Sequence, residues 1–376
     1  MGRVGMERLA PAALFLDPPS HHFLGDRLFD SRTVPVGGDD ILAPYARIRE
    51  HFASAGIPVH TADRLEGPPL AERNVCVSMG MLENYRRIAD RGDTSLAAFF
   101  AMECPIVEPG LYRALPEAAR AFKRVFSWSD TETLLPFTGK PVRVERFRWP
   151  QSFDRVHEEI WRRGGRKFLV MINANKLPRL QTQELYTERL RALAFFGAKG
   201  EIDLYGPGWY EAPFRVGKTW IPWTLRRLHR AAWKRWQKVR PDPLYAAARR
   251  AWRGRAASKS ETLGRYAYAL CFENMSLKGW ITEKIFDCFF AGTIPVYRGA
   301  PDIAEAVPPE CFVDARLFGG YAELREALRG MSEREREGYR TAARDFLASS
   351  RFDPFRREAF LSIFRRIVAE ETGLAV

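Results

Sequence analysis

Short apolar runs alternate with segments of helical spacing along most of the chain. The runs are rich in β-branched and aromatic residues and have the length of buried strands; they lie at 74–79, 96–102, 122–128, 167–172 and 202–205. Between them, residues 43–55 and 185–196 repeat apolar side chains every three or four positions, as amphipathic helices do. This alternation predicts an α/β protein with parallel sheets covered on both faces.

The pattern is clearest between residues 266 and 303. An apolar run at 268–272 predicts a buried strand, and the polar, turn-prone loop at 273–279 is expected to lie outside the core. Thr282 suits a helix N-cap, and Glu283 and Lys284 fall in the first turn, where backbone N–H groups are unpaired. An anion there would meet free donors, the positive end of the helix dipole and the Lys284 ammonium.

The rest of this helix has an apolar face. Its members, spaced to hold the helix against a sheet, are Ile285, Phe286, Phe289 and Phe290. Gly292 is expected to end the helix, and residues 293–297 return as a strand. The same spacing also fits an ordinary capped helix whose first-turn charges are solvated.

Length and pattern together predict two domains, because 376 residues exceed what one hydrophobic core usually organises. Residues 1–150 form a first α/β unit, 151–165 a crossover linker and 166–350 a second α/β unit. Residues 351–376 form an amphipathic C-terminal helix. Such a helix can cross back to brace both domains or cap the sheet of its own domain.

The five cysteines are scattered and form no CxxC pair, which is typical of reduced core residues in a cytosolic protein. The apolar patch at 10–16 is shorter than a signal-peptide core, and no window reaches the roughly 18 apolar residues of a membrane span. We therefore expect a cytoplasmic protein that is at most peripheral, at the inner face of the cell membrane.

Basic charge is concentrated in a predicted insertion at 213–253. Residues 218–253 hold eleven lysines and arginines against one acid, in a chain whose formal net charge is +13, and they include five tryptophans. Residues 225–239 have the spacing of a basic amphipathic helix, which suits an anionic membrane surface. A loop that packs its tryptophans on its own domain is the alternative. Nucleic acid is a less favoured partner for this segment and is not expected, since the rest of the chain is not basic and has no nucleic-acid motif.

Several chemistries have no motif in this sequence: GxSxG, HExxH, paired CxxC, GxxxxGK[ST] and GxGxxG are missing, and the six histidines form no metal-site pattern. Glu103 is a candidate general base, because it follows the apolar run at 96–102 and has apolar neighbours that would raise its pKa. A carboxylate in this position can equally be an ordinary loop charge.

The stretch CFENMSLKGWITEKIFDCFFAGTIPVYRGAPDI resembles the donor-binding signature of the α-1,3/4-fucosyltransferases, glycosyltransferase family 10, bacterial type. The resemblance rests on FEN at 272–274, TEK at 282–284 and IPVYRG at 294–299. Weaker similarities extend over most of residues 90–350 outside the insertion; they are FFAMECP, LYTERL followed by IDLYGPGW, and WRG followed by Ser258-Lys259.

This resemblance implies a GT-B fold, with two Rossmann-like domains facing a cleft, and inverting transfer of fucose from GDP-fucose without a metal. By the same resemblance, Lys284, Asn274 and Arg189 would neutralise the GDP leaving group, and Glu283 would accept hydrogen bonds from sugar hydroxyls. Tyr205 and Lys259 would also bind the donor. Glu103 would take the proton of the acceptor hydroxyl.

Trp280 departs from the family pattern, which often has tyrosine there. It keeps an aromatic ring that can stack but lacks the hydroxyl that could hydrogen-bond to the donor. The expected acceptor is a glycan hydroxyl such as O3 or O4 of GlcNAc, and a lipid-linked glycan is one candidate. Two alternatives remain: a GT-B transferase that uses another nucleotide sugar, and a non-catalytic protein that binds a membrane surface or nucleic acid through its basic insertion.

Overall fold

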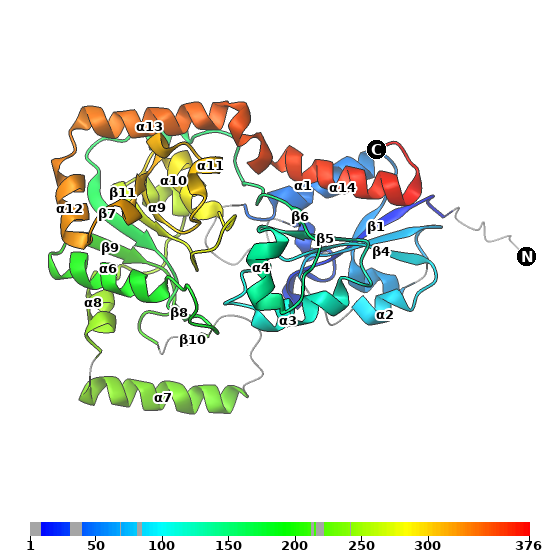
Figure 1. Ribbon diagram of the computed structural model, residues 1–376, viewed down its shortest axis with the longest axis horizontal. Coiled ribbons are helices and arrows are strands. Elements are labelled where there is room, and N and C mark those ends of the chain that lie inside the picture. The colour runs from blue at the N-terminus through cyan, green and yellow to red at the C-terminus, as the bar shows by residue number, and fades with distance from the viewer. Residues whose placement is uncertain are drawn as a thin grey trace, which may run out of the picture.

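The computed structural model describes residues 9–30, 40–67, 69–80, 85–211, 214–215, 222–240 and 242–376. Within these residues the chain forms two parallel sheets that lie side by side along the long axis of the molecule, each with helices on both faces (Figure 1). The predicted α/β class is confirmed. The strands are parallel because each is joined to the next by a crossover that usually carries a helix.

The first sheet has the strand order β2-β1-β3-β4-β5-β6. Its strands are β1 (Ala13–Asp17), β2 (Val59–Thr61), β3 (Asn74–Ser78), β4 (Thr94–Phe100), β5 (Arg124–Ser127) and β6 (Glu145–Arg146). One face packs against α1 (Ala43–Ser54) and α14 (Arg357–Thr372). The other face packs against α2 (Tyr85–Ala89), α3 (Pro109–Ala118) and α4 (Thr131–Thr138).

The second sheet has the order β13-β12-β11-β7-β9. Its strands are β7 (Lys167–Ile172), β9 (Ile202–Tyr205), β11 (Tyr266–Phe272), β12 (Ile294–Arg298) and β13 (Val313–Asp314). One face is covered by α5 (Glu158–Trp161), α9 (Lys259–Leu263), α10 (Glu283–Ala291), α11 (Ile303–Ala306) and α13 (Glu333–Ala348). The opposite face is covered by α6 (Tyr186–Ala198), α8 (Pro243–Ala251) and α12 (Tyr321–Gly330).

Shorter elements complete the fold. A separate parallel pair consists of β8 (Lys176–Leu177) and β10 (Phe214–Arg215). The 3-10 turns are η1 (His21–Phe23), η2 (Arg27–Phe29), η4 (Ala62–Glu66), η5 (Pro309–Cys311), η6 (Ala315–Leu317) and η7 (Ser350–Phe355). All five cysteines are free and buried, as the sequence predicts.

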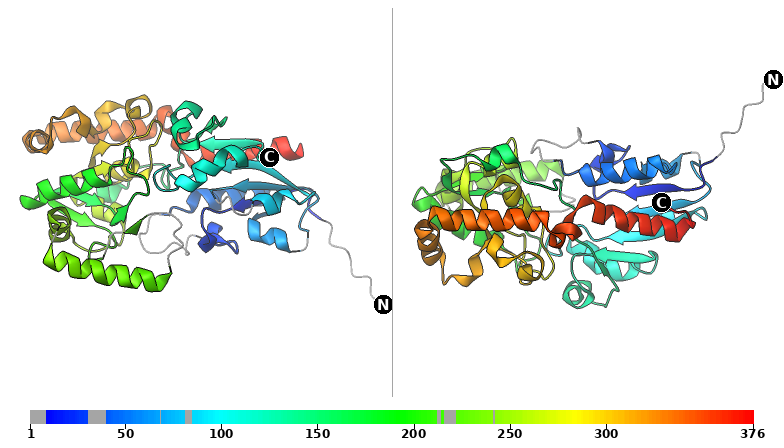
Figure 2. Two further views of the ribbon diagram at one scale, coloured as in Figure 1. Left: turned by 60° about the horizontal axis from the view of Figure 1, so that its bottom comes forward. Right: turned by 90° about the horizontal axis from the view of Figure 1, so that it is seen from above.

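The C-terminal helix α14 crosses back onto the first domain. Phe360 and Phe364 lie in the core of the first sheet, and the Phe364 ring stacks on Phe100 of β4 with centroids 5.6 Å apart. At the far end, Arg73 donates to the Thr372 carbonyl at 2.6 Å. The helices α13 and α14 therefore run along one side of both domains (Figure 2).

Only part of the predicted insertion 213–253 stands apart from the fold. The helix α8 packs against α6, with Tyr245, Ala248 and Ala251 in the core, and the Trp252 indole donates to the Gly206 carbonyl at 2.7 Å. The helix α7 (Trp223–Val239) lies on the outside of the domain (Figure 1), which it contacts through Trp233 against Tyr245 of α8, with ring centroids 6.1 Å apart, and through Arg230 paired with Glu211 at 3.4 Å. The insertion as predicted is thus too long, because its small alanine-rich end forms a layer of the second domain.

The loop at 273–279, predicted to lie outside the core, is largely buried. Met275 and Leu277, together with Trp280, belong to the hydrophobic cluster of the first domain. Ser129 of the first domain donates to the Lys278 carbonyl at 2.5 Å, and Lys278 pairs with Asp130 at 2.9 Å. This loop therefore joins the two domains. Its polar residues make hydrogen bonds and an ion pair across the interface, and its apolar residues pack in the core.

Other element boundaries differ modestly from the prediction. The last helix begins at Arg357, six residues after the predicted start at 351. The residues before it form the turn η7, which contains Pro354. Residues 213, 216–221 and 241 of the predicted insertion lie outside the described residues.

Candidate active site

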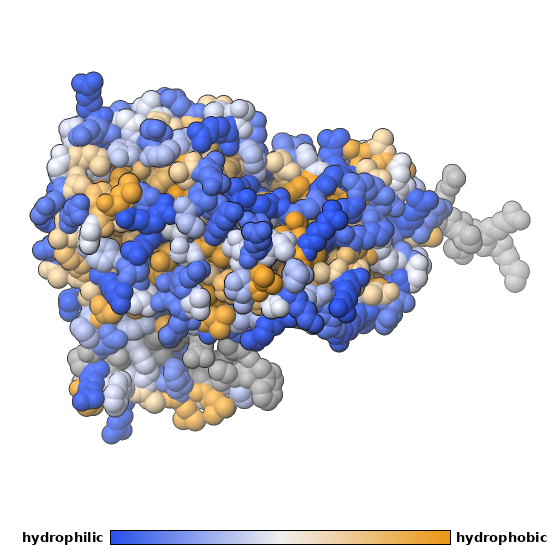
Figure 3. All heavy atoms as spheres, viewed as in Figure 1, coloured by the Kyte–Doolittle hydropathy of each residue, from blue (hydrophilic) through white to orange (hydrophobic). Residues whose placement is uncertain are grey.

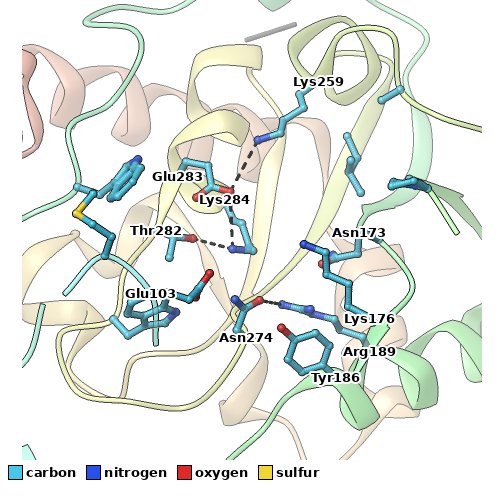
Figure 4. A pocket seen from close by; sticks show the side chains of 18 of the residues that line it. Glu103, Asn173, Lys176, Tyr186, Arg189, Lys259, Asn274, Thr282, Glu283 and Lys284 are labelled. Atoms are coloured by element: carbon cyan, nitrogen blue, oxygen red, sulfur yellow. Dashed lines mark hydrogen bonds and ion pairs between the residues drawn. The ribbon is translucent and has the colours of Figure 1, made fainter. Parts of the chain in front are cut away.

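A cavity of about 470 Å³ opens between the two domains, where strands of both sheets end at their carboxyl ends. This is the edge at which parallel sheets collect ligands. The first domain contributes Met102, Glu103, Trp128 and Trp149. Most of the remaining lining comes from the loops after β7, β9 and β11 and from the start of α10, whose side chains converge on the opening in Figure 4.

The first turn of α10 is organised by a buried carboxylate that the sequence did not single out. Glu273, fully buried, accepts from the Thr282 backbone N–H at 2.9 Å, from the Thr282 hydroxyl at 2.8 Å and from Lys284 Nζ at 3.1 Å. Thr282 occupies the N-cap position but makes no side-chain cap bond. The predicted N-cap position is confirmed, but the hydroxyl holds Glu273 and Lys284 together instead of capping the helix, with Lys284 Nζ at 2.8 Å.

Lys284 lies between two carboxylates at the mouth of the helix. Its ammonium is 3.1 Å from Glu273 and 3.8 Å from Glu283. Burial alone would lower the pKa of Lys284, but the Glu273 and Glu283 charges outweigh it and raise the pKa above the ordinary lysine value. Lys284 is therefore a fixed cation, held in place beneath the cavity.

Glu283 sits beside the same lysine and remains partly open to the cavity. Burial opposes its ionisation, yet Lys284 and Lys259, each 3.8 Å away, hold the pKa of Glu283 at about 2. Lys259 is itself anchored by Asp287 of α10 at 3.0 Å. Glu283 is consequently an ionised hydrogen-bond acceptor at any physiological pH.

Arg189 of α6 is a second cation at the cavity, and its orientation is set by the end of β11. Its guanidinium donates to the Phe272 carbonyl at 2.6 Å and to Asn274 Oδ1 at 3.1 Å, and it lies 4.7 Å from the centre of the Tyr186 ring. Burial lowers the pKa of Arg189, partly offset by Tyr186 and Glu273. The predicted grouping of Arg189, Asn274 and Lys284 in one site is observed (Figure 4).

Glu103 reaches the cavity from the first domain. It lies three residues after β4, and one carboxylate oxygen accepts from the Cys104 backbone N–H at 2.9 Å. Burial raises the pKa of Glu103, while that hydrogen bond and the charges of Lys284 and Lys176 moderate the rise. The direction of this shift agrees with the expectation from its apolar neighbours.

One more predicted residue and one missed residue line the cavity, whereas a third, predicted residue lies elsewhere. Trp280 lines the cavity with its ring centroid 4.5 Å from that of Trp128, but its buried indole N–H has no hydrogen-bond partner within the described residues. Tyr205 is not part of the lining; its hydroxyl is 3.3 Å from that of Tyr266, inside the second domain. Lys176, which the sequence analysis missed, lines the cavity opposite Glu103.

Part of the chain matches a known protein family. The model of the glycosyltransferase family 10 (fucosyltransferase) C-terminal domain matches residues 235–341, a range that contains β11, α10 and β12. This match covers less than a third of the chain and lies within its second domain. The sequence resemblance is thereby confirmed.

Named relatives match this chain over short segments. The α-(1,3)-fucosyltransferase FucT of Helicobacter pylori is 42% identical over 66 residues, which are 18% of this chain and 14% of that protein. Human α-(1,3)-fucosyltransferase 7 is 38% identical over 108 residues, which are 28% of this chain and 31% of that protein. The matches thus span less than a third of either relative.

Solved structures match over nearly the whole chain. The structure of Anabaena HepE in complex with UDP and glucose has a TM-score of 0.52 at 12% identity, covering 96% of this chain and all of that one. An α1,3-fucosyltransferase structure has a TM-score of 0.49 at 14% identity, covering 95% of this chain and 90% of that one. The architecture of this chain is GT-B, as the resemblance implied.

The residues missed by sequence reasoning left different signals. Glu273 is the middle letter of the quoted FEN motif, and its role could have been suspected from its position directly after a buried strand. Lys176 gave no signal, because β8 is two residues long and its position at the cavity depends on pairing with β10.

Among the described residues, no cluster of three or more His, Cys, Asp and Glu side chains has the arrangement of a metal site. No described helix is both long and apolar enough to cross a membrane.

Proposed function

We propose that this protein transfers fucose from GDP-fucose to a glycan hydroxyl, with inversion at the anomeric carbon and without a metal. One observation carries the proposal: Glu103 of one domain shares a single cavity with the cations Lys284 and Arg189 of the other. A base and a leaving-group site on opposite walls are what a displacement at a sugar carbon requires.

The second domain supplies the site for the leaving group. The first turn of α10 presents backbone N–H groups and the Lys284 ammonium, and Arg189 and Asn274 add polar groups from the neighbouring loop and helix. As the glycosidic bond breaks, negative charge develops on the diphosphate, and cations fixed in advance stabilise it without a reorganisation cost. Lysine and arginine thus take the part that a divalent cation plays in other transferases.

The first domain supplies the base. The acceptor hydroxyl gives its proton to Glu103 while its oxygen forms a bond to the anomeric carbon, and the electron pair of the breaking bond leaves with GDP. Because Glu103 is partly buried and its pKa is raised, the carboxylate is a stronger base than an exposed glutamate. Attack from the wall opposite the diphosphate inverts the anomeric configuration.

Donor recognition is tested with purified protein and GDP-fucose. We expect Glu103→Gln to keep its affinity for GDP in calorimetry and to lose turnover by about 100- to 10,000-fold, the range of general-base contributions. Lys284→Ala should weaken GDP binding by about 10- to 100-fold, because a hydrogen bond to a charged group is lost. Full turnover by Glu103→Gln would refute its assignment as the base.

Three finer points remain predictions with simple tests. Turnover should persist in EDTA; loss of turnover that Mg²⁺ or Mn²⁺ restores would refute metal independence. A donor screen separates GDP-fucose from other nucleotide sugars, the first alternative function. An acceptor array, with GlcNAc-containing and lipid-linked glycans, identifies the hydroxyl that is used. Absence of both GDP binding and turnover would favour the non-catalytic alternative.

The helix α7 supports a peripheral membrane location. Leu225, Leu228, Trp236 and Val239 fall on one side of the helix and are 54–74% exposed, and Figure 3 shows hydrophobic side chains on this outlying segment. Its other side is basic, and α7 contains no acidic residue. An exposed apolar stripe beside basic charge fits the interface of an anionic bilayer, whereas the phosphates of nucleic acid would leave the stripe uncovered.

The membrane prediction needs point variants, because deleting the whole insertion would also remove the packed helix α8. We expect Leu228→Ser together with Trp236→Ser to abolish sedimentation with vesicles that contain an anionic phospholipid. Leu317→Ser is the matched control, since Leu317 is 79% exposed but lies on the turn η6. Equal sedimentation of the α7 variant and the control would assign α7 no part in membrane binding.

A further inference from the structure

A second cavity, of about 830 Å³, lies at the amino ends of the strands of the second sheet, on the edge opposite the candidate active site. Its walls are the segment from α5 to β7, the starts of β11 and β12, and the facing side of α13. We call this cavity the arginine pocket, because seven arginines line it: 162, 163, 166, 329, 336, 340 and 344. Three glutamates line it as well, at 158, 333 and 337.

The glutamates neutralise only part of this charge. Arg336 pairs with Glu333 at 2.6 Å and Arg340 with Glu337 at 2.7 Å. Glu158 is shared, at 3.2 Å from Arg344 and at 3.6 Å from Arg162.

The remaining three arginines use partners elsewhere. Arg163 pairs with Glu261, and Arg329 pairs with Glu201 at 2.9 Å, both outside the lining. Arg166 has no carboxylate within ion-pair distance among the described residues and donates to backbone carbonyls, including that of Gly292 at 2.8 Å. The pocket therefore keeps an excess of positive charge.

Aromatic rings and burial hold several of these guanidinium groups in place. The Arg329 guanidinium lies 3.9 Å from the centre of the Phe168 ring, and Arg344 and Arg340 lie 4.5 and 5.0 Å from that of Trp161. The Nε atoms of Arg340 and Arg344 are buried without an acceptor within the described residues. The rings thus fix three guanidinium groups at the wall of the pocket.

Like-charge crowding is greatest at Arg166. Burial, and then the nearby charges of Arg340 and Arg163, lower the pKa of Arg166 to about 10. An anion in the pocket would relieve this repulsion.

A purely structural role explains some of the arginines but not all of them. Arg166 and Arg340 donate to the carbonyls at the ends of α10 and α5, where a parallel sheet gathers helix C-termini. Within the described residues, the side chains of Arg162 and Arg344 donate to no carbonyl; both pair with Glu158, and Arg344 also stacks on Trp161. Their side chains are 78% and 43% exposed and hold no helix end in place, so they can be changed to test the pocket without disturbing the fold.

We propose that the arginine pocket binds a ligand that carries two or more phosphate groups. Arginine forks match phosphate oxygens in pairs, and arginines arranged on two walls of a cavity of this size suit a diphosphate better than a single small anion. The proposal is independent of the fucosyltransferase function, because it uses none of the residues of the first cavity. The same chemistry could come from a free organic diphosphate or from a phosphorylated lipid headgroup.

The test uses the full chain, with inorganic pyrophosphate as the probe in isothermal titration calorimetry. Arg344→Glu and Arg162→Glu should each weaken pyrophosphate binding at this site by about tenfold or more, since each replaces an attraction by a repulsion. Arg334→Glu is the matched control, because Arg334 is an exposed arginine of α13 outside the pocket. Lys284→Ala identifies any pyrophosphate bound in the first cavity, which should respond to that variant alone.

A second arm measures sedimentation with phosphatidylcholine vesicles that contain phosphatidylinositol bisphosphate, in a Leu228→Ser and Trp236→Ser background that removes the apolar stripe of α7. A pyrophosphate signal lost in Arg344→Glu supports a site for a free diphosphate. A sedimentation signal lost in Arg344→Glu supports a headgroup site. If neither probe distinguishes Arg344→Glu and Arg162→Glu from Arg334→Glu, while thermal unfolding shows all three folded, the proposal is overturned.

Discussion

The carboxylate of Glu273 offers a sharp test of how the candidate active site is built. Glu273→Gln keeps an acceptor for the Thr282 N–H and hydroxyl, but it replaces the oxygen that faces Lys284 with an NH₂ donor. Breaking a buried ion pair from one side costs about 3–5 kcal/mol. Lys284 is 20% exposed and keeps Glu283 at 3.8 Å, so we expect a smaller loss of about 2 kcal/mol.

Thermal unfolding measures this loss. For a domain of this size, about 2 kcal/mol corresponds to a fall in Tm of about 4–8 °C. The control is Glu305→Gln, the same change at an exposed glutamate of α11, which should leave Tm within about 1–2 °C of the parent, as surface changes usually do.

The proposed function adds a second expectation. A GDP diphosphate next to Lys284 would supply the missing negative charge, so saturating GDP should recover part of the lost Tm. An unchanged Tm for Glu273→Gln would refute the claim that this carboxylate holds the helix mouth together. An equal loss with and without GDP would contradict the position proposed for the diphosphate.

Two other predictions concern the domain interface and the base. Gly279 has φ of +80° and an added Cβ would lie 2.3 Å from the Trp128 carbonyl oxygen, so Gly279→Ala should destabilise the protein by about 1–3 kcal/mol in urea unfolding. Gly254→Ala, at φ of +107° in open space, isolates the backbone part of that cost, and equal effects of the two variants would mean that the contact is unimportant. For the base, turnover should fall as pH decreases through the raised pKa of Glu103, at a pH above its ordinary value of 4.5. Lys176→Met removes a positive charge that lowers this pKa, so it should move the acidic limb of the kcat profile to higher pH; a limb that stays in place or moves down would show that Lys176 does not act on Glu103.

The elements nearest the site were predictable because their signals are local. The nine residues of α10 and the glycine that follows them contain its apolar face, its charged first turn and its C-cap. The strands that precede and follow this helix are continuous apolar runs. Glu103 was found in the same way, from the apolar run of β4 that ends just before it. A short window of sequence contains everything that such features depend on.

The predictions that failed concern segments whose environment is made by distant residues. The loop at 273–279 looked solvent-exposed, yet it is buried because Trp128 and its neighbours in the other domain cover it. The helix α8 looked like part of a basic insertion, but its alanines fit against α6. Lys176 gained its place only through the pairing of β8 with β10.

The sequence by itself determined the α/β class, the helix that begins at Glu283 and the family signature around it, because periodicity and motif spacing report how each segment meets its immediate surroundings. Only the tertiary structure decided that Glu273 lies beneath Lys284, that α14 returns to the first domain, and that seven arginines converge at the far edge of the second sheet. These facts depend on contacts between residues far apart in the chain, and local pattern carries no record of which distant partner will cover a side chain or share its charge.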